Sequence, residues 1–95
     1  MNAAPRPLLV RGGRVLAGDG WRDDCDVVVA DGVVAALGGD VAAAGAEPID
    51  VRGHVVAPGF VDLHVHGAGG AMFEDGDRDG VRHIRATLAA HGTTA

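Results

Sequence analysis

The residues best suited to chemistry are two histidines separated by one residue, His64 and His66, preceded by Asp62. In an extended strand alternate side chains share a face, so both imidazoles would project on one side with Cα atoms about 7 Å apart. Two neutral imidazoles at this spacing can share one divalent ion. Asp62 faces the same way and is predicted to accept a hydrogen bond from one ring, which would fix its tautomer. The alternative is a pair of partly exposed surface histidines.

The other polar candidates give weaker signals. Residues 67–70, Gly-Ala-Gly-Gly, either bring backbone N–H groups toward an anion or form a turn, and their spacing matches no nucleotide-binding motif. Cys25 has no basic neighbour in sequence, so a structural thiol is favoured over a nucleophile. The sequence also has an acidic cluster, for which we favour a solvent-exposed loop and the start of a helix over a cation site: Glu74, Asp75, Asp77 and Asp79. Surface, packing or helix-end roles without a metal are predicted for His54, His83 and His91.

The elements before these residues are short apolar runs separated by turn signals. Residues 8–11 and 14–16 flank Gly12-Gly13, and residues 26–30 and 33–37 flank Asp31-Gly32. A third pair, residues 49–51 and 54–57, flanks Arg52-Gly53, and residues 40–47 read as a loop or one helical turn. Because Gly-Gly and Asp-Gly suit tight hairpin turns, the sequence predicts three hairpins and an antiparallel β-module over residues 7–57.

A different pattern begins at residue 58. Residues 60–66 alternate as one strand, a glycine-rich loop follows, and apolar residues at helical spacing (Val81, Ile84 and Leu88) predict a helix over about 79–91 that ends at Gly92. Residues 93–95 could begin another strand. Strand, helix and strand in this order predict a parallel unit, which needs several neighbours to bury both faces. We therefore expect two domains, 1–57 and 58–95, the second incomplete, in the N-terminal piece of a longer protein.

Composition excludes several classes of protein. The net charge of −5 argues against a nucleic-acid or anionic-membrane surface as the main partner. One cysteine excludes an internal disulfide framework and suits a reducing compartment. No apolar run approaches the roughly 20 residues that span a bilayer, and the first seven residues lack the apolar core of a secretory signal. A cytoplasmic location is expected.

Residues 58–67, Pro-Gly-Phe-Val-Asp-Leu-His-Val-His-Gly, resemble the amidohydrolase superfamily. The preceding β-module looks like that family's small N-terminal β-sandwich lobe. Within the superfamily, His-Gly-Ala-Gly-Gly at 66–70 and His-Gly-Thr-Thr-Ala at 91–95 are most similar to N-acetylglucosamine-6-phosphate deacetylases. A dihydroorotase-like protein would be expected to carry an arginine shortly after the second histidine, where this chain has Gly67-Ala68-Gly69.

The resemblance implies an α/β fold in which the small β-sandwich lobe precedes the first strand–helix unit of a metal-dependent (β/α)₈ TIM barrel. It implies that His64 and His66 are metal ligands, with Asp62 supporting them. Zinc suits such ligands, and iron or another divalent ion is compatible with them. The implied reaction is hydrolysis of an N-acetyl group on an amino-sugar phosphate to glucosamine 6-phosphate and acetate, a step of amino sugar metabolism. The general base, an Asp, would lie beyond residue 95, and the full-length form would be a homo-oligomer.

Length sets the remaining expectation. A barrel of this type needs about 250 residues, so we expect the 95-residue piece alone to be inactive. Two alternatives stay open: another amidohydrolase that acts on cyclic amides or N-acyl compounds, and a complete, non-catalytic β-module used for binding or assembly.

Overall fold

The computed structural model describes residues 4–95 and divides into two compact units, with the boundary in the chain between Ala57 and Pro58. Met1, Asn2 and Ala3, the start of the segment for which no secretory signal is expected, lie outside the described residues. Among the residues described, no helix is long and apolar enough to cross a membrane. Each unit has its own sheet and its own contacts, and they are treated in turn.

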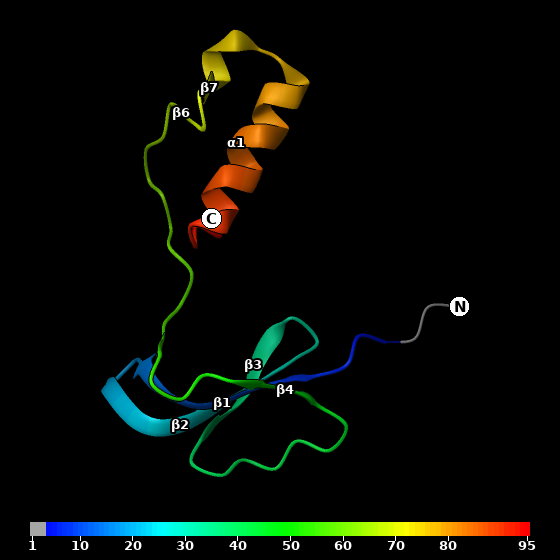
Figure 1. Cartoon of the computed structure of the whole chain (residues 1–95), viewed down its shortest axis with the longest axis vertical. Helices are drawn as coiled ribbons and strands as arrows, with labels where there is room; N and C mark the ends of the chain where they lie inside the picture. The colour runs from blue at the N-terminus through cyan, green and yellow to red at the C-terminus, as the bar shows by residue number, and fades with distance from the viewer. Residues whose placement is uncertain (1–3) are drawn as a thin grey trace. The chain divides into compact units, whose positions relative to one another are not determined.

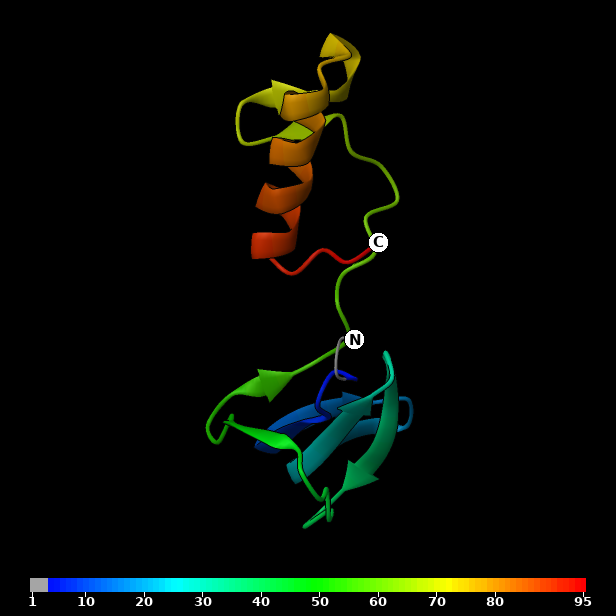
Figure 2. The same cartoon turned by 90° about the vertical axis from the view of Figure 1, so that its right-hand side faces the viewer.

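The first unit is a mixed β-sheet (Figures 1 and 2). Its strands are β1 (Leu8–Ala17), β2 (Gly20–Ala30), β3 (Val33–Gly38), β4 (Glu47–Asp50) and β5 (Val55–Val56). The order is β3-β2-β1-β4, and β5 also pairs with β1. β2 runs antiparallel to β1 and β3, whereas β4 and β5 run parallel to β1. The prediction of a purely antiparallel module is therefore wrong.

The predicted hairpin at Gly12-Gly13 does not form, because β1 continues through both glycines. β2 pairs with β1 over its whole length, and the register shifts on either side of Gly13. The glycines thus make a bulge in one long strand instead of reversing the chain. Gly12 has φ of 76°, and a Cβ on Gly13 would lie 2.9 Å from side-chain carbons of Val51 and Val56. Glycine is needed at the first position for its dihedral and at the second for space.

The third predicted hairpin, around Arg52-Gly53, is also wrong. The turn carries the chain from β4 to β5, but the two strands pair with successive parts of β1 and not with each other. Val51 N–H donates to the Arg11 carbonyl at 2.9 Å, and Arg14 N–H donates to the His54 carbonyl at 3.0 Å. β4 and β5 both pair with the edge of β1 that β2 does not occupy. Local turn signals do not predict this non-local pairing.

The middle hairpin is confirmed. Asp31 and Gly32 join β2 to β3 with φ of 52° and 79°, the two positive values that a type I′ turn requires. Residues 40–46 form a loop with a turn and no helix. The core of the unit lies between β1 and β2, where Val15, Cys25 and Val27 are buried together.

The second unit is a segment with one isolated bridge at Phe60, a small hairpin and a helix. β6 (Gly67–Ala68) and β7 (Ala71–Met72) form the hairpin, a 3₁₀ turn (η1, Phe73–Asp75) follows, and α1 (Arg78–Ala90) packs on both hairpin strands. Asp77 caps the helix, since its carboxylate accepts the N–H of Gly80 at 2.9 Å. Gly92, with φ of 91°, terminates it as predicted. Ile84, in the predicted apolar stripe, is fully buried.

The predicted strand over 60–66 is only partly formed. Phe60 bridges Thr93 in parallel, and Asp62 N–H donates to the Ala95 carbonyl at 2.8 Å. The strand–helix–strand order therefore gives the expected parallel pairing. Residues 63–66 continue without a ladder partner among the described residues. Val61 and Leu63, on the predicted apolar face, are 65% and 92% exposed.

Candidate metal centre

The two candidate ligands converge. The Nε2 atoms of His64 and His66 lie 3.0 Å apart, and their ring centroids are 4.8 Å apart. Two nitrogens bound to one zinc ion at about 2.0–2.1 Å each are separated by about 2.9–3.4 Å for N–Zn–N angles near 90–109°. The observed separation falls inside this interval, so the distance between the two nitrogens fits a shared divalent ion. The backbone that holds them is residues 63–66, which bends at Leu63 and at His66 and follows the pairing of residues 60–62 with residues 92–95.

The ring of His66 has a carboxylate partner that sequence reasoning did not select. Its Nδ1 lies 3.0 Å from Oε1 of Glu74. The β6–β7 hairpin folds the chain back, and Phe73 N–H donates to the His66 carbonyl at 2.9 Å, which brings residue 74 beside residue 66. Glu74 was assigned to a solvated loop, and it is indeed exposed, yet it contacts the candidate ligand. The sequence signal that could have identified this contact is an acidic residue, Glu74, a few residues after the tight turn at Gly69-Gly70.

Asp62 does not make the predicted contact with a ring. Its Oδ1 accepts the backbone N–H of His64 at 3.1 Å. Because the acceptor and its donor are two residues apart, this is a local turn-like contact, and it fixes the backbone and not the imidazole. Asp62 therefore orders the chain just before the histidines.

The glycine-rich loop is a tight turn tied to the helix. Gly69 and Gly70 have φ of 60° and 84°, and they join β6 to β7. Nε2 of His83 lies 2.9 Å from the Gly69 carbonyl, so its N–H donates there. His83 was predicted to face solvent, and it does so while also holding this loop. A Cβ on Gly69 would lie 2.5 Å from that same nitrogen, so only glycine permits the approach.

The remaining candidates have structural contacts. His54 Nδ1 is 3.2 Å from the Arg52 carbonyl, and His91 Nδ1 is 2.8 Å from the Thr87 carbonyl. Cys25 is 2% exposed in the core, as expected of a structural thiol. In the part of the chain that the structure describes, no three or more His, Cys, Asp and Glu side chains gather around one point. A complete ligand set would therefore need donors beyond this pair.

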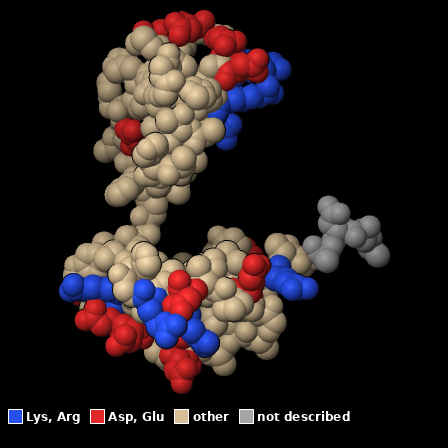
Figure 3. Space-filling view, in the orientation of Figure 1, with Lys and Arg blue, Asp and Glu red and all other residues tan. Residues whose placement is uncertain are grey.

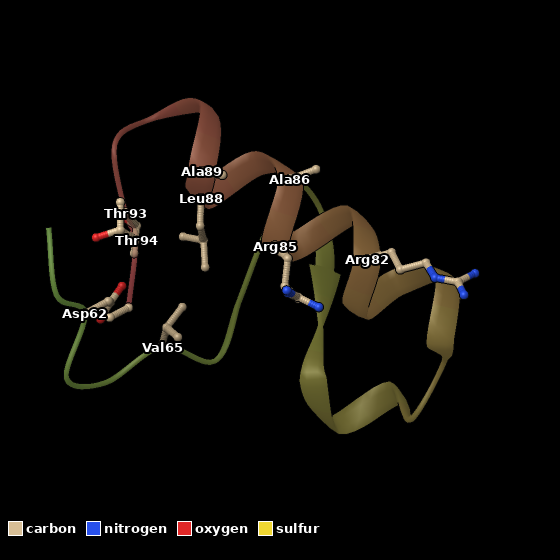
Figure 4. Close-up of a pocket in the computed structure, with 10 residues that line it drawn as sticks. Asp62, Val65, Arg82, Arg85, Ala86, Leu88, Ala89, Thr93 and Thr94 are labelled. Carbon is tan, nitrogen blue, oxygen red and sulfur yellow. The ribbon is translucent and has the colours of Figure 1, made fainter. Parts of the chain in front are cut away.

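A groove of about 660 Å³ in the second unit has a lining that does not include His64 or His66. Val65 and Leu88 point toward each other across it (Figure 4). Arg82, Arg85 and Asp62 also line it. Acidic side chains gather on η1 and the start of α1, above the arginines of the helix (Figure 3).

Comparison with known proteins finds relatives that are named allantoinase and dihydroorotase. The chain is 44% identical over 88 residues to an allantoinase of Rubrobacter xylanophilus, covering 92% of this chain and 18% of the relative. It is 47% identical over 60 residues to a dihydroorotase of Streptococcus pneumoniae, covering 62% of this chain and 14% of the relative. No family model matches.

A solved structure matches nearly all of the chain. It is an N-acetyl-D-glucosamine-6-phosphate deacetylase from Mycobacterium smegmatis, a mutant in complex with N-acetyl-D-glucosamine 6-phosphate. The match has a TM-score of 0.82 at 31% identity and covers 96% of this chain and 24% of that one. The chain thus spans between about a seventh and a quarter of the length of these relatives. The predicted fold class, a small β lobe followed by the first strand–helix unit of an amidohydrolase, is confirmed. The chain belongs to the amidohydrolase superfamily.

Proposed function

We propose that this segment supplies the first two metal ligands, His64 and His66, of a metal-dependent hydrolase that cleaves a carbon–nitrogen bond. The observation that carries the proposal is the convergence of the two Nε2 atoms to 3.0 Å. Zinc suits paired imidazoles, and iron or another divalent ion is compatible with them. A bound divalent ion would polarise an amide carbonyl and activate water. The further ligands and the general base would come from outside residues 62–74.

The substrate we propose is N-acetylglucosamine 6-phosphate, with acetate and glucosamine 6-phosphate as products. Support comes from the 31% identical deacetylase structure, which covers both units. The residues after His66 add to it, since the Gly69-Gly70 turn brings no arginine side chain beside the histidines. In this reaction His64 and His66 bind the metal, and the turn that follows them in the chain is held by the contact of His83 with the Gly69 carbonyl. We place the protein in the cytoplasm, in keeping with its small-molecule substrate.

A second candidate is hydrolysis of a cyclic amide. The sequence relatives are named allantoinase and dihydroorotase, and the former is 44% identical over most of the chain. Both candidates share the metal-dependent attack of water on an amide carbonyl. They differ in the group that the site must recognise: a sugar phosphate in the first case, and a ureide or dihydropyrimidine ring in the second.

The test uses the natural polypeptide that carries this sequence, purified with its metal. Acetate release from N-acetylglucosamine 6-phosphate is compared with ring opening of allantoin and dihydroorotate. A kcat/KM at least 100-fold higher for the sugar phosphate supports the deacetylase, and the reverse order supports the cyclic amide. The variants His64→Ala and His66→Ala should each lose bound metal and activity. Unchanged metal content and rate in both variants would refute the ligand assignment.

A further inference from the structure

We infer that Glu74 is a positioning residue for His66, which holds the imidazole in the tautomer that presents Nε2 to a metal. The inference rests on the proposed function in one respect only, that His66 is a ligand. The contact itself, Nδ1 of His66 to Oε1 of Glu74 at 3.0 Å, is independent of that role. Glu74 is not itself proposed as a metal ligand, because it contacts Nδ1 of His66 and the metal would bind Nε2.

The chemistry of the contact fixes the position of the proton. An ionised carboxylate accepts hydrogen bonds and donates none, so Nδ1 of His66 must carry the hydrogen. A neutral imidazole has one N–H, and its other nitrogen then holds the lone pair. Nε2 of His66 is therefore the ligating atom, and it is the atom that faces His64.

The same reasoning assigns the second ring. The two Nε2 atoms are at hydrogen-bond distance, 3.0 Å, and the His66 atom holds a lone pair. With His66 in this neutral tautomer, the Nε2 of His64 donates in the metal-free protein. Metal binding then requires His64 to change tautomer, so that its proton lies on Nδ1 and not on Nε2. His66 already has the tautomer that leaves its Nε2 free. Glu74 thus makes the two ligands unequal before the metal arrives.

Local folding explains why the carboxylate stays in place. Glu74 sits in the 3₁₀ turn η1, which follows the β6–β7 hairpin directly. Asp75 accepts the Met72 N–H at 3.3 Å, and Gly76 N–H donates to the Phe73 carbonyl at 3.2 Å, so both neighbours are fixed. An exposed side-chain contact of this kind contributes little to stability, and Glu74 and His66 are both mostly exposed. The expected effect is therefore on metal binding and tautomer, and much less on folding.

The experiment compares Glu74→Ala, Glu74→Gln and the control Glu47→Ala, an exposed glutamate of β4 in the first unit. All are made in the natural polypeptide. Zinc dissociation constants are measured by chelator competition. Loss of a carboxylate partner of a ligating histidine typically costs 10–100-fold in metal affinity. We expect that loss for alanine, a smaller one for glutamine, which keeps an oxygen acceptor, and none for the control.

A second readout needs no metal. The ¹⁵N chemical shifts of the ring nitrogens report the tautomer, and in the metal-free protein we expect His66 as Nδ1–H and His64 as Nε2–H. Glu74→Ala should shift His66 toward Nε2–H, and Glu74→Gln should not. Zinc affinity within threefold of wild type, or an unchanged tautomer, in Glu74→Ala would overturn the inference. If wild type binds zinc no better than His66→Ala, the proposed function fails, and the ¹⁵N shifts still decide the role of Glu74.

Discussion

Replacing Asp26 with alanine should destabilise the first unit by about 2–4 kcal/mol. Asp26 is 4% exposed, and its carboxylate accepts the N–H of Gly12 at 2.9 Å and the N–H of Val41 at 3.3 Å. Both donors are partly buried, so each one left without its partner costs about 1–2 kcal/mol, the lower part of the range for buried donors. The half-exposed Arg11, 3.8 Å away, adds below about 1 kcal/mol.

The position of these donors makes the prediction specific. Gly12 lies in the bulge of β1, and Val41 lies in the loop after β3, so one carboxylate anchors both irregular segments to β2. Amide hydrogen exchange should show lost protection at Gly12 and Val41 in Asp26→Ala, beyond the change at other β1 amides. Asp26→Asn keeps one acceptor oxygen and should lose about half as much stability.

The matched control is Asp23→Asn, a carboxylate of the same strand whose side chain is 75% exposed beside Arg14. Surface substitutions of this kind change stability by about 0.5 kcal/mol or less. Denaturant midpoints and slopes for the three variants are compared with wild type. The reasoning is refuted if Asp26→Ala and Asp23→Asn destabilise equally, or if the Gly12 and Val41 amides keep their protection.

Three further expectations concern other parts of the chain. Ile84→Ala removes a fully buried side chain of α1 and should cost about 2–5 kcal/mol, read from the denaturant midpoint of the second unit. Hydrogen bonds from Arg52 lower the pKa of Asp50 from the ordinary value of 3.8 to about 2. The stabilisation by this pair is therefore present above pH 3.8 and is lost as the pH falls toward 2. Arg52→Ala should return the midpoint of the Asp50 carboxyl ¹³C titration toward 3.8. Gly69→Ala should cost about 1–2 kcal/mol at φ of 60° and displace the His83 ring, seen as loss of its contact to the loop in NMR spectra.

Local signals were sufficient where an element depends on its own residues. The Asp31-Gly32 turn needs two positive φ values, and residues that tolerate them stand there. The helix was predictable because Ile84 and its neighbours recur at helical spacing and Gly92 supports the left-handed terminus. The pairing of Phe60 with Thr93 followed from the order strand, helix, strand.

Local signals failed where the partner is distant in sequence. Gly12-Gly13 and Arg52-Gly53 both look like hairpin turns, yet β1 runs through the first and pairs with the strands on both sides of the second. Turn propensity describes the conformation of two residues, and it does not specify which strand edge is free to accept the next segment. The sheet therefore contains both antiparallel pairs, as between β1 and β2, and parallel pairs, as between β1 and β4.

The candidate site divides in the same way. The sequence by itself predicted that His64 and His66 lie close together, because alternate side chains of an extended chain share a face. Only the tertiary structure decided how their rings are oriented and which acid supports them: Glu74 in place of Asp62. The physical reason is that a side-chain hydrogen bond forms only if folding brings the two residues together. The β6–β7 hairpin, whose turn His83 contacts, brings Glu74 back beside His66. The spacing of residues along the chain does not specify this approach.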